Sequence, residues 1–149
     1  MRPSASGRDG GASRRTLAHP SALRAVRMQG DVLATGGLDA VVRVFALSTF
    51  QLVRELRGHE GPVQSLALGG SVLVSGGTDD KTIKVWSLLE DVDASECATL
   101  DEHPGYVRSV AISPSGGFVA SVINDEGGRL NADHGKLFVW RPADTKKAR

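Results

Sequence analysis

Four histidines and one cysteine are the residues of this chain whose side chains could bind a metal or move a proton. His19, His59, His103 and His134 are dispersed along the sequence, and Cys97 is the only cysteine. Zinc sites that are recognisable in a sequence need several such ligands at short spacing, so we expect no metal centre. A histidine beside an acid can also act as a general base. Whether these histidines do so depends on the elements that surround them.

Two stretches have part of the composition of a ligand-binding loop. Residues 76–82, GGTDDKT, place a Lys-Thr pair after glycines as phosphate-binding loops do, but the glycine before the lysine and the following helix are missing. Residues 125–133 are rich in oxygen ligands that suit calcium, but they have neither the EF-hand spacing nor its closing glutamate. No GxSxG motif of a hydrolase is present. We therefore expect no cofactor and no catalytic residues.

The histidines also mark a repeated pattern. The first two are 40 residues apart, and the second and third are 44 apart. The phrase LATGGLD at 33–39 matches LVSGGTD at 73–79 position by position. Each copy also ends in an aromatic residue, and these are Phe45, Trp86 and Trp140. Three approximate copies therefore cover residues 16–141.

Each copy contains short β-type runs separated by turn residues. Runs rich in Val, Ile and Leu alternate with Gly, Pro, Asn and Asp, which is the pattern of consecutive antiparallel hairpins. Strict alternation of apolar and polar residues is blurred, as in VVRVF at 41–45, and this indicates sheets packed on both faces. The predicted strands are 23–28, 32–35, 41–45 and 51–57, then 63–68, 72–75, 82–86 and 96–100, then 107–113, 118–123 and 136–140.

Residues 57–86, RGHEGPVQSLALGGSVLVSGGTDDKTIKVW, resemble one complete WD repeat, the roughly 40-residue unit of a β-propeller blade. The resemblance lies in Gly58–His59 at the start, an aspartate in the second turn and Val85–Trp86 at the end. It implies an all-β fold of about three four-stranded antiparallel blades in a partial or open propeller. The repeats would lie at about 16–57, 58–100 and 101–141.

In WD repeats a His, a Ser or Thr, an Asp and a Trp form a buried hydrogen-bonded chain that holds the segment before the first strand against the second turn. The resemblance thus implies a structural role for the histidines. The acid of the second copy stays open between Asp79 and Asp80, because Asp79 lies seven residues before the closing Trp whereas Asp39 lies six before its Phe. That of the third is Asp125 or Asp133. The network residues assigned in this way are His19, Thr35 and Asp39; His59, Ser75, Asp79 and Trp86; and His103, Ser121 and Trp140.

The two ends of the chain are more basic than its middle. We expect residues 1–15 to be a disordered basic leader and residues 142–149 a basic tail. Their arginines are not interleaved with aromatic residues, so we expect solvated tails and no nucleic-acid binding. No apolar run reaches the roughly 20 residues of a membrane span, and the start has no secretory signal. With a single cysteine, these features favour an intracellular protein, cytoplasmic or nuclear.

The resemblance implies binding of a protein or peptide on the edge formed by the segments before the first strands and by the second turns. It predicts a non-enzymatic protein–protein interaction scaffold, either a fragment of a longer propeller or a substrate-receptor-like adaptor. The alternative function is an RNA- or chromatin-associated factor that uses the basic tails. The predicted contact residues are Leu38, Glu60, Asp79 and Tyr106.

Three blades are fewer than the four to eight with which propellers close. We expect residues 16–18 to be an outer strand that belongs to another blade, and the third copy to lack an outer strand of its own. The chain is then a fragment of a longer propeller, an open arc, or half of a six-bladed ring that forms by self-association. The residues alone leave these three arrangements open.

Overall fold

The computed structural model of the chain describes residues 13–90, 98–101, 103–124 and 136–142. The expected leader and tail lie almost wholly outside this part, as do residues 91–97 and the loop at 125–135. The described residues contain strands that form three antiparallel sheets. They contain no helix long and apolar enough to cross a bilayer.

Each sheet follows the chain in order, so every neighbouring pair is a hairpin or a simple antiparallel connection. The first sheet is β1 (Leu23–Gln29), β2 (Val32–Gly37), β3 (Val42–Ala46) and β4 (Gln51–Leu56). The second is β5 (Val63–Gly69), β6 (Val72–Gly77), β7 (Ile83–Ser87) and β8 (Ala98–Leu100). The third is β9 (Tyr106–Ile112), β10 (Val119–Asn124) and β11 (Lys136–Trp140).

The prediction of an all-β fold built from four-stranded units is confirmed, with the third sheet reduced to three strands among the described residues. Every strand predicted within the three copies has a counterpart, with shifts of one or two residues at its ends. The expected outer strand at 16–18 is wrong, because this segment forms no strand. A β-strand needs a partner ladder, and the third strand of a preceding sheet, beside which this segment would lie, is not part of this chain.

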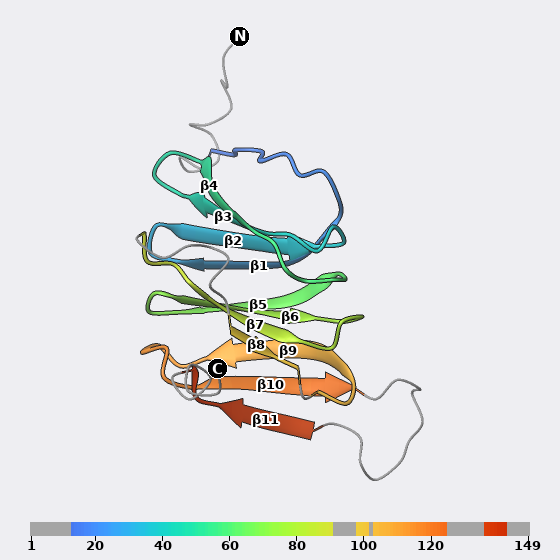
Figure 1. Cartoon of the computed structure of the whole chain (residues 1–149). Coiled ribbons are helices and arrows are strands. Elements are labelled where there is room, and N and C mark those ends of the chain that lie inside the picture. The colour runs from blue at the N-terminus through green and yellow to red at the C-terminus, as the bar shows by residue number, and fades with distance from the viewer. Residues whose placement is uncertain (1–12, 91–97, 102, 125–135, 143–149) are drawn as a thin grey trace.

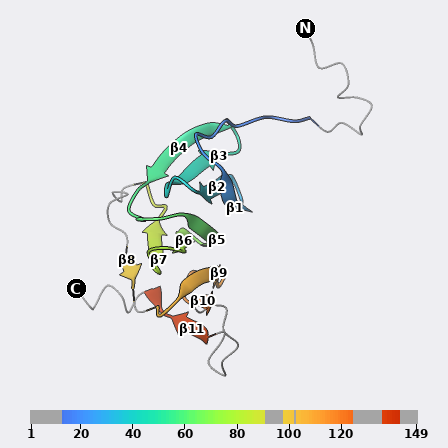
Figure 2. The same cartoon turned by 90° about the vertical axis from the view of Figure 1, so that its right-hand side faces the viewer.

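The three sheets are stacked one on another in chain order (Figure 1). The first sheet lies at one end of the stack and the third at the other, with the second between them. Seen from the side, the first strands β1, β5 and β9 follow one side of the stack, and β4 and β8 follow the other (Figure 2). The described residues therefore form an open stack of three sheets with two end faces.

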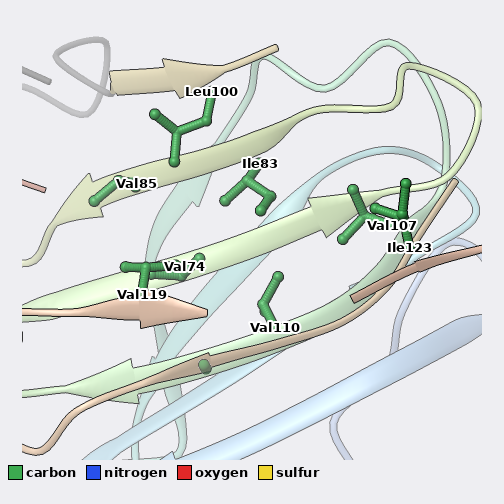
Figure 3. Close-up of a cluster of buried hydrophobic side chains, with 9 residues drawn as sticks. Val74, Ile83, Val85, Leu100, Val107, Val110, Val119 and Ile123 are labelled. Carbon is green, nitrogen blue, oxygen red and sulfur yellow. The ribbon is translucent and has the colours of Figure 1, made fainter. Parts of the chain in front are cut away.

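Two hydrophobic clusters hold the stack together, one at each junction between sheets. The cluster between the second and third sheets joins β5, β6, β7 and β8 to β9 and β10 (Figure 3). Its buried members are Ala67, Val74, Ile83, Val85, Leu100, Val107, Val110, Val119 and Ile123. The cluster between the first and second sheets consists of Ala34, Val42, Val44, Leu56, Val63, Leu66, Leu73 and Trp86. The middle sheet is buried on both faces. The blurred alternation at 41–45 lies in the first sheet, where all five of these residues are buried.

Polar side chains also join the first two sheets. Arg54 on β4 donates from Nη1 to the carbonyl oxygen of Ser87 at 3.2 Å and from Nη2 to that of Leu89 at 2.7 Å. At the other side of the stack, Gln29 at the end of β1 donates from Nε2 to the carbonyl oxygen of Gly70 at 3.1 Å. Since these acceptors are backbone atoms, the three bonds fix the position of the backbone as well as that of side chains.

Glycines in the second strands allow neighbouring sheets to approach closely. A Cβ atom on Gly36 would lie 2.6 Å from Cγ1 of Val63, and one on Gly76 would lie 2.6 Å from Cγ1 of Val107. Both glycines occupy the same place in the repeated phrase, next to Thr35 and Ser75. The Gly-Gly pairs that the sequence reads as turn signals are thus partly a packing requirement of the stacked sheets.

We predict that Gly76→Ala destabilises the fold, because its Cβ would also lie 2.7 Å from Oγ of Ser65 and 3.1 Å from Cγ1 of Val110. Overpacking of this kind costs about 1–3 kcal/mol. Gly117→Ala is the matched control, since its Cβ would meet only the flexible Ser115 Oγ at 3.3 Å. Urea unfolding followed by circular dichroism measures both. Equal midpoints for the two variants would contradict the packing argument.

Candidate functional site

The second repeat contains a continuous hydrogen-bonded chain of four side chains. Trp86 Nε1 donates to Ser75 Oγ at 2.8 Å. Oγ of Ser75 lies 2.7 Å from Nε2 of His59, and Nδ1 of His59 lies 2.7 Å from Oδ2 of Asp80. With the imidazole proton on Nδ1, each group donates to the next, from the indole through the hydroxyl and the imidazole to the carboxylate.

Asp80 also fixes the backbone on both sides of the turn. The backbone N–H of Glu60 donates to Oδ2 at 3.1 Å, and that of Thr82 donates to Oδ1 at 3.2 Å. Burial raises the pKa of the Asp80 carboxyl. The hydrogen bond and charge of His59 and the two backbone N–H groups lower it by more, so the pKa falls from 3.8 to about 2. The segment before β5 and the turn between β6 and β7 are therefore joined by an ionised carboxylate.

The assignment of Asp79 to this network is wrong, because Asp80 occupies the position. Asp79 is exposed, and its side chain lies beside Gly61. The turn explains the difference. Lys81 has a positive φ of 56° and Ala40 in the first repeat has one of 67°, so the two turns match when they are counted back from the third strand. On that count Asp80, and not Asp79, corresponds to Asp39.

The first repeat has the same turn but no such network. Asp39 Oδ1 accepts from the backbone N–H of Val41 at 3.3 Å, as Asp80 does from Thr82. Its other oxygen pairs with Arg43 Nη1 at 2.8 Å instead of with His19. Nδ1 of His19 bonds to the carbonyl oxygen of Leu17 at 2.9 Å, and its Nε2 lies 3.0 Å from Thr35 Oγ1. The assignment of Asp39 to the histidine network is therefore wrong.

Phe45 and Arg43 explain why the first repeat differs. Phe45 has no N–H to donate to Thr35, and its ring lies edge-on to His19, with centroids 5.4 Å apart. Arg43 is buried, and its Nε also lies 3.5 Å from Oε1 of Glu55. A buried guanidinium requires carboxylate partners, so Asp39 is drawn to it. Sequence analysis missed this ion pair, although an arginine between valines in VVRVF was a signal for it.

The third repeat brings together the three residues assigned to it. Ser121 Oγ lies 3.0 Å from Nε2 of His103, and Trp140 Nε1 donates to the same oxygen over 3.5 Å. The rings of His103 and Trp140 are 5.4 Å apart between centroids. The two candidate acids, Asp125 and Asp133, lie outside the described residues.

The segments before β1, β5 and β9 and the turns β2–β3 and β6–β7 together form what we call the turn edge, the right-hand end of the stack in Figure 1. The segments and turns are tied at equivalent places. Leu38 N–H donates to the carbonyl oxygen of Ala22 at 2.9 Å, and Thr78 N–H donates to that of Pro62 at 3.2 Å. The turn edge is thus a set of short loops with fixed backbone, which is a suitable frame for binding.

All four predicted contact residues lie on the turn edge. Leu38 and Asp79 are exposed in the two turns, and Glu60 is exposed before β5. Tyr106 is half-buried at the start of β9. Lys81 Nζ lies 6.0 Å from the centroid of the Tyr106 ring, a contact between the second and third repeats that sequence analysis did not anticipate.

The comparisons with known proteins agree with this geometry. The family model for the WD domain, G-beta repeat, matches residues 50–87 and 94–141, which is more than half of the chain. The chain belongs to the WD-repeat family. The three sheets are accordingly called blades from here on.

Among relatives, this WD-repeat chain is 34% identical over 96 residues to pre-mRNA-processing factor 19 homolog 2 of Arabidopsis thaliana, which covers 64% of the chain. It is 32% identical over 139 residues, or 89% of its length, to a periodic tryptophan protein 2 homolog of Schizosaccharomyces pombe. The chain spans only 18% and 15% of these two proteins. Among solved structures, it matches the computationally designed Ika4 protein with a TM-score of 0.68 and 26% identity, over 84% of this chain and 69% of that one.

We predict that Asp80→Asn destabilises the second blade while Asp79→Asn does not. Removal of a charged, buried hydrogen-bond acceptor costs about 1.5–3 kcal/mol, whereas an exposed substitution usually stays within about 0.5 kcal/mol. The two variants make the same chemical change at adjacent positions. Urea unfolding followed by tryptophan fluorescence, which reports on Trp86 and Trp140, measures the difference. A larger loss from Asp79→Asn would contradict the assignment of Asp80.

The lowered pKa of Asp80 also predicts a pH dependence. The carboxylate stabilises the folded chain above its ordinary pKa of 3.8, and this contribution is lost as the pH falls through the folded pKa of about 2. We expect the urea midpoint of the wild type to fall between about pH 4 and pH 2. The Asp80→Asn variant lacks this carboxyl and should lose less stability over the same range. Parallel curves for the two proteins would contradict the prediction.

Proposed function

We propose that this chain is a non-enzymatic interaction module that binds a protein or peptide on its turn edge. One observation carries the proposal. The exposed carboxylates of Glu60 and Asp79 lie on backbone that the His59–Asp80 network fixes, and the ring of Tyr106 lies beside Lys81 of the same turn. A site whose loops are already ordered loses little conformational entropy on binding, which favours affinity.

The chemistry of the turn edge suits a mixed polar and apolar ligand. Glu60 and Asp79 offer acceptors to a basic side chain of a partner. Tyr106 offers an aromatic surface, and an aromatic residue is typical of the few positions that dominate binding energy. We infer a peptide segment that carries a basic residue close to an apolar one.

The His59–Asp80 pair supports a structural role and not a catalytic one. The side chain of His59 is fully buried, and both of its ring nitrogens are in hydrogen bonds within the network. A general base must lie within hydrogen-bond reach of a substrate proton. The names of the relatives, one of them a pre-mRNA-processing factor, favour an intracellular location that includes the nucleus.

We predict that Asp79→Lys and Tyr106→Ala each weaken peptide binding about tenfold or more, which is a loss of about 1.4 kcal/mol. The ligands would be peptides selected from a displayed random library on the immobilised full chain. Fluorescence anisotropy with the labelled peptides measures the affinity. Asp79 is exposed, so its replacement changes the charge of the site without removing a buried contact.

Leu89→Asp is the control for this experiment. Leu89 is exposed after β7 and does not belong to the turn edge. Its replacement should leave peptide affinity unchanged. Selected peptides that bind all three variants as tightly as the wild type would show that the turn edge is not the site, and a library that yields no binder would contradict the interaction module.

An RNA-associated role is the second candidate, because one relative is named a pre-mRNA-processing factor. Binding through basic residues to phosphates weakens steeply with added salt. Titration with a labelled single-stranded oligouridine at increasing salt therefore separates the two candidates. Salt-sensitive binding to the oligonucleotide without peptide binding would favour this role.

A further inference from the structure

The two end faces of the stack expose apolar side chains in regular rows. On the first blade the row lies along β1 and consists of Leu23, Val26 and Met28, which are 43%, 53% and 66% exposed. On the third blade the row crosses β10 and β11 and consists of Val122, Leu137 and Val139, of which the last two are 66% and 62% exposed. No described residue of the chain covers either row.

The row on β1 corresponds to a buried row of the second blade. Leu23 is paired with Gly37 across the hairpin and Val26 with Thr35. In the second blade Val63 is paired with Gly77 and Leu66 with Ser75, at the same places. Val63 and Leu66 are completely buried against the first blade. The exposed row of β1 is therefore the half-interface that a blade offers to its predecessor.

The row on β11 corresponds to the other half of such an interface. Leu137 is paired with Val122, and Val139 with Ala120. In the second blade the equivalent strand β7 pairs Ile83 with Gly76 and Val85 with Val74. Ile83 and Val85 are buried in the cluster that faces the third blade. The exposed row of β11 is the half-interface that a blade offers to its successor.

Among the described residues, the third blade has no strand on the outer side of β11. In the first two blades the third strands β3 and β7 are each followed by an outer strand, β4 or β8, that ends three residues before the next histidine. Beside β11 the described residues supply no such strand. Residues 13–16 precede His19 at the corresponding spacing, and they form no strand in this chain.

We propose that a second copy of this chain covers these faces, and that two copies join head to tail into a six-bladed ring. The first blade of each copy packs on the third blade of the other, and residues 13–16 of each copy pair with β11 of the other. The two end faces are opposite halves of an interface that the chain already makes twice. Such a contact is heterologous, and it closes when the rotation per blade allows.

Two copies of this chain would supply six blades. Propellers close with four to eight blades, and six is the multiple of three within that range. The new junctions would be wider than those within the chain. Val122 stands where Gly36 and Gly76 permit close approach, and across the junction Leu23 is larger than Val63. Larger side chains on both sides fill a wider separation.

The first measurement is the mass of the full wild-type chain by light scattering after size-exclusion chromatography, at concentrations of about 1–100 μM, where weak association of this size class is detectable. We expect a single species of twice 15.7 kDa. A monomer over the whole range would overturn the proposal, and a ladder of larger species would overturn ring closure.

Two double variants then test the faces. Val26→Asp with Met28→Asp blocks the first blade, and Leu137→Asp with Val139→Asp blocks the third. Because both junctions of the ring use one face of each kind, each variant alone should be a monomer. An equimolar mixture keeps one intact junction and should form a dimer. Leu89→Asp, which replaces a side chain that is 51% exposed away from both faces, should remain a dimer.

The mixture distinguishes this contact from a symmetric one. If identical faces met, one of the two double variants would stay dimeric and mixing would restore nothing, and that result would overturn the proposal. The replaced side chains are all solvent-exposed, so circular dichroism spectra should match that of the wild type. The mass of the wild-type chain shows whether a dimer forms, and this result does not depend on any variant.

Discussion

The stability of this chain depends on face-to-face contact between sheets. A single blade of four short strands has two apolar faces and cannot bury either by itself. The middle blade succeeds because a neighbour lies on each side, and its residues Leu66, Val74 and Trp86 are almost completely buried. The end blades have a neighbouring blade on one face only, and apolar side chains of β1, β10 and β11 stay exposed on the other. The glycines of the second strands and the polar bonds between sheets allow these faces to meet at a fixed distance.

The three repeats differ most in the network around their histidines. The second has the full set, with Asp80 ionised between two backbone N–H groups and His59. The first has Phe45 in place of the tryptophan, and its Asp39 forms an ion pair with Arg43. Its histidine then turns to the backbone of Leu17. A repeat can therefore lose the network and retain its turn, because the turn itself depends on the Asp-to-backbone bond that Asp39 and Asp80 share.

Much of the fold follows from local pattern, while the site depends on details that a linear count misses. The recurrence of His, Gly-Gly and a closing aromatic predicted the strands and their order, since hairpins are local structures. The acid of the second network could be chosen only when the left-handed residue Lys81 showed which side of the turn to count from. The partnership of Arg43 with Asp39 and Glu55 joins three different elements, and its buried position follows from packing. The strand expected at 16–18 was placed closer to its histidine than β4 and β8 are to theirs, and the described residues offer no third strand for it to pair with.

The double burial of the middle blade has a consequence for how the molecule opens. In a stack where each unit touches only its neighbours, the free energy of local opening is lowest at the ends and rises inward. β6 has five consecutive buried residues between two clusters, while most residues of β1 and β11 face solvent. Fraying would therefore start at the two outer blades and reach β6 last. The middle blade is then the last part of the chain to unfold. Its polar network keeps one turn of the turn edge ordered while the outer blades fluctuate.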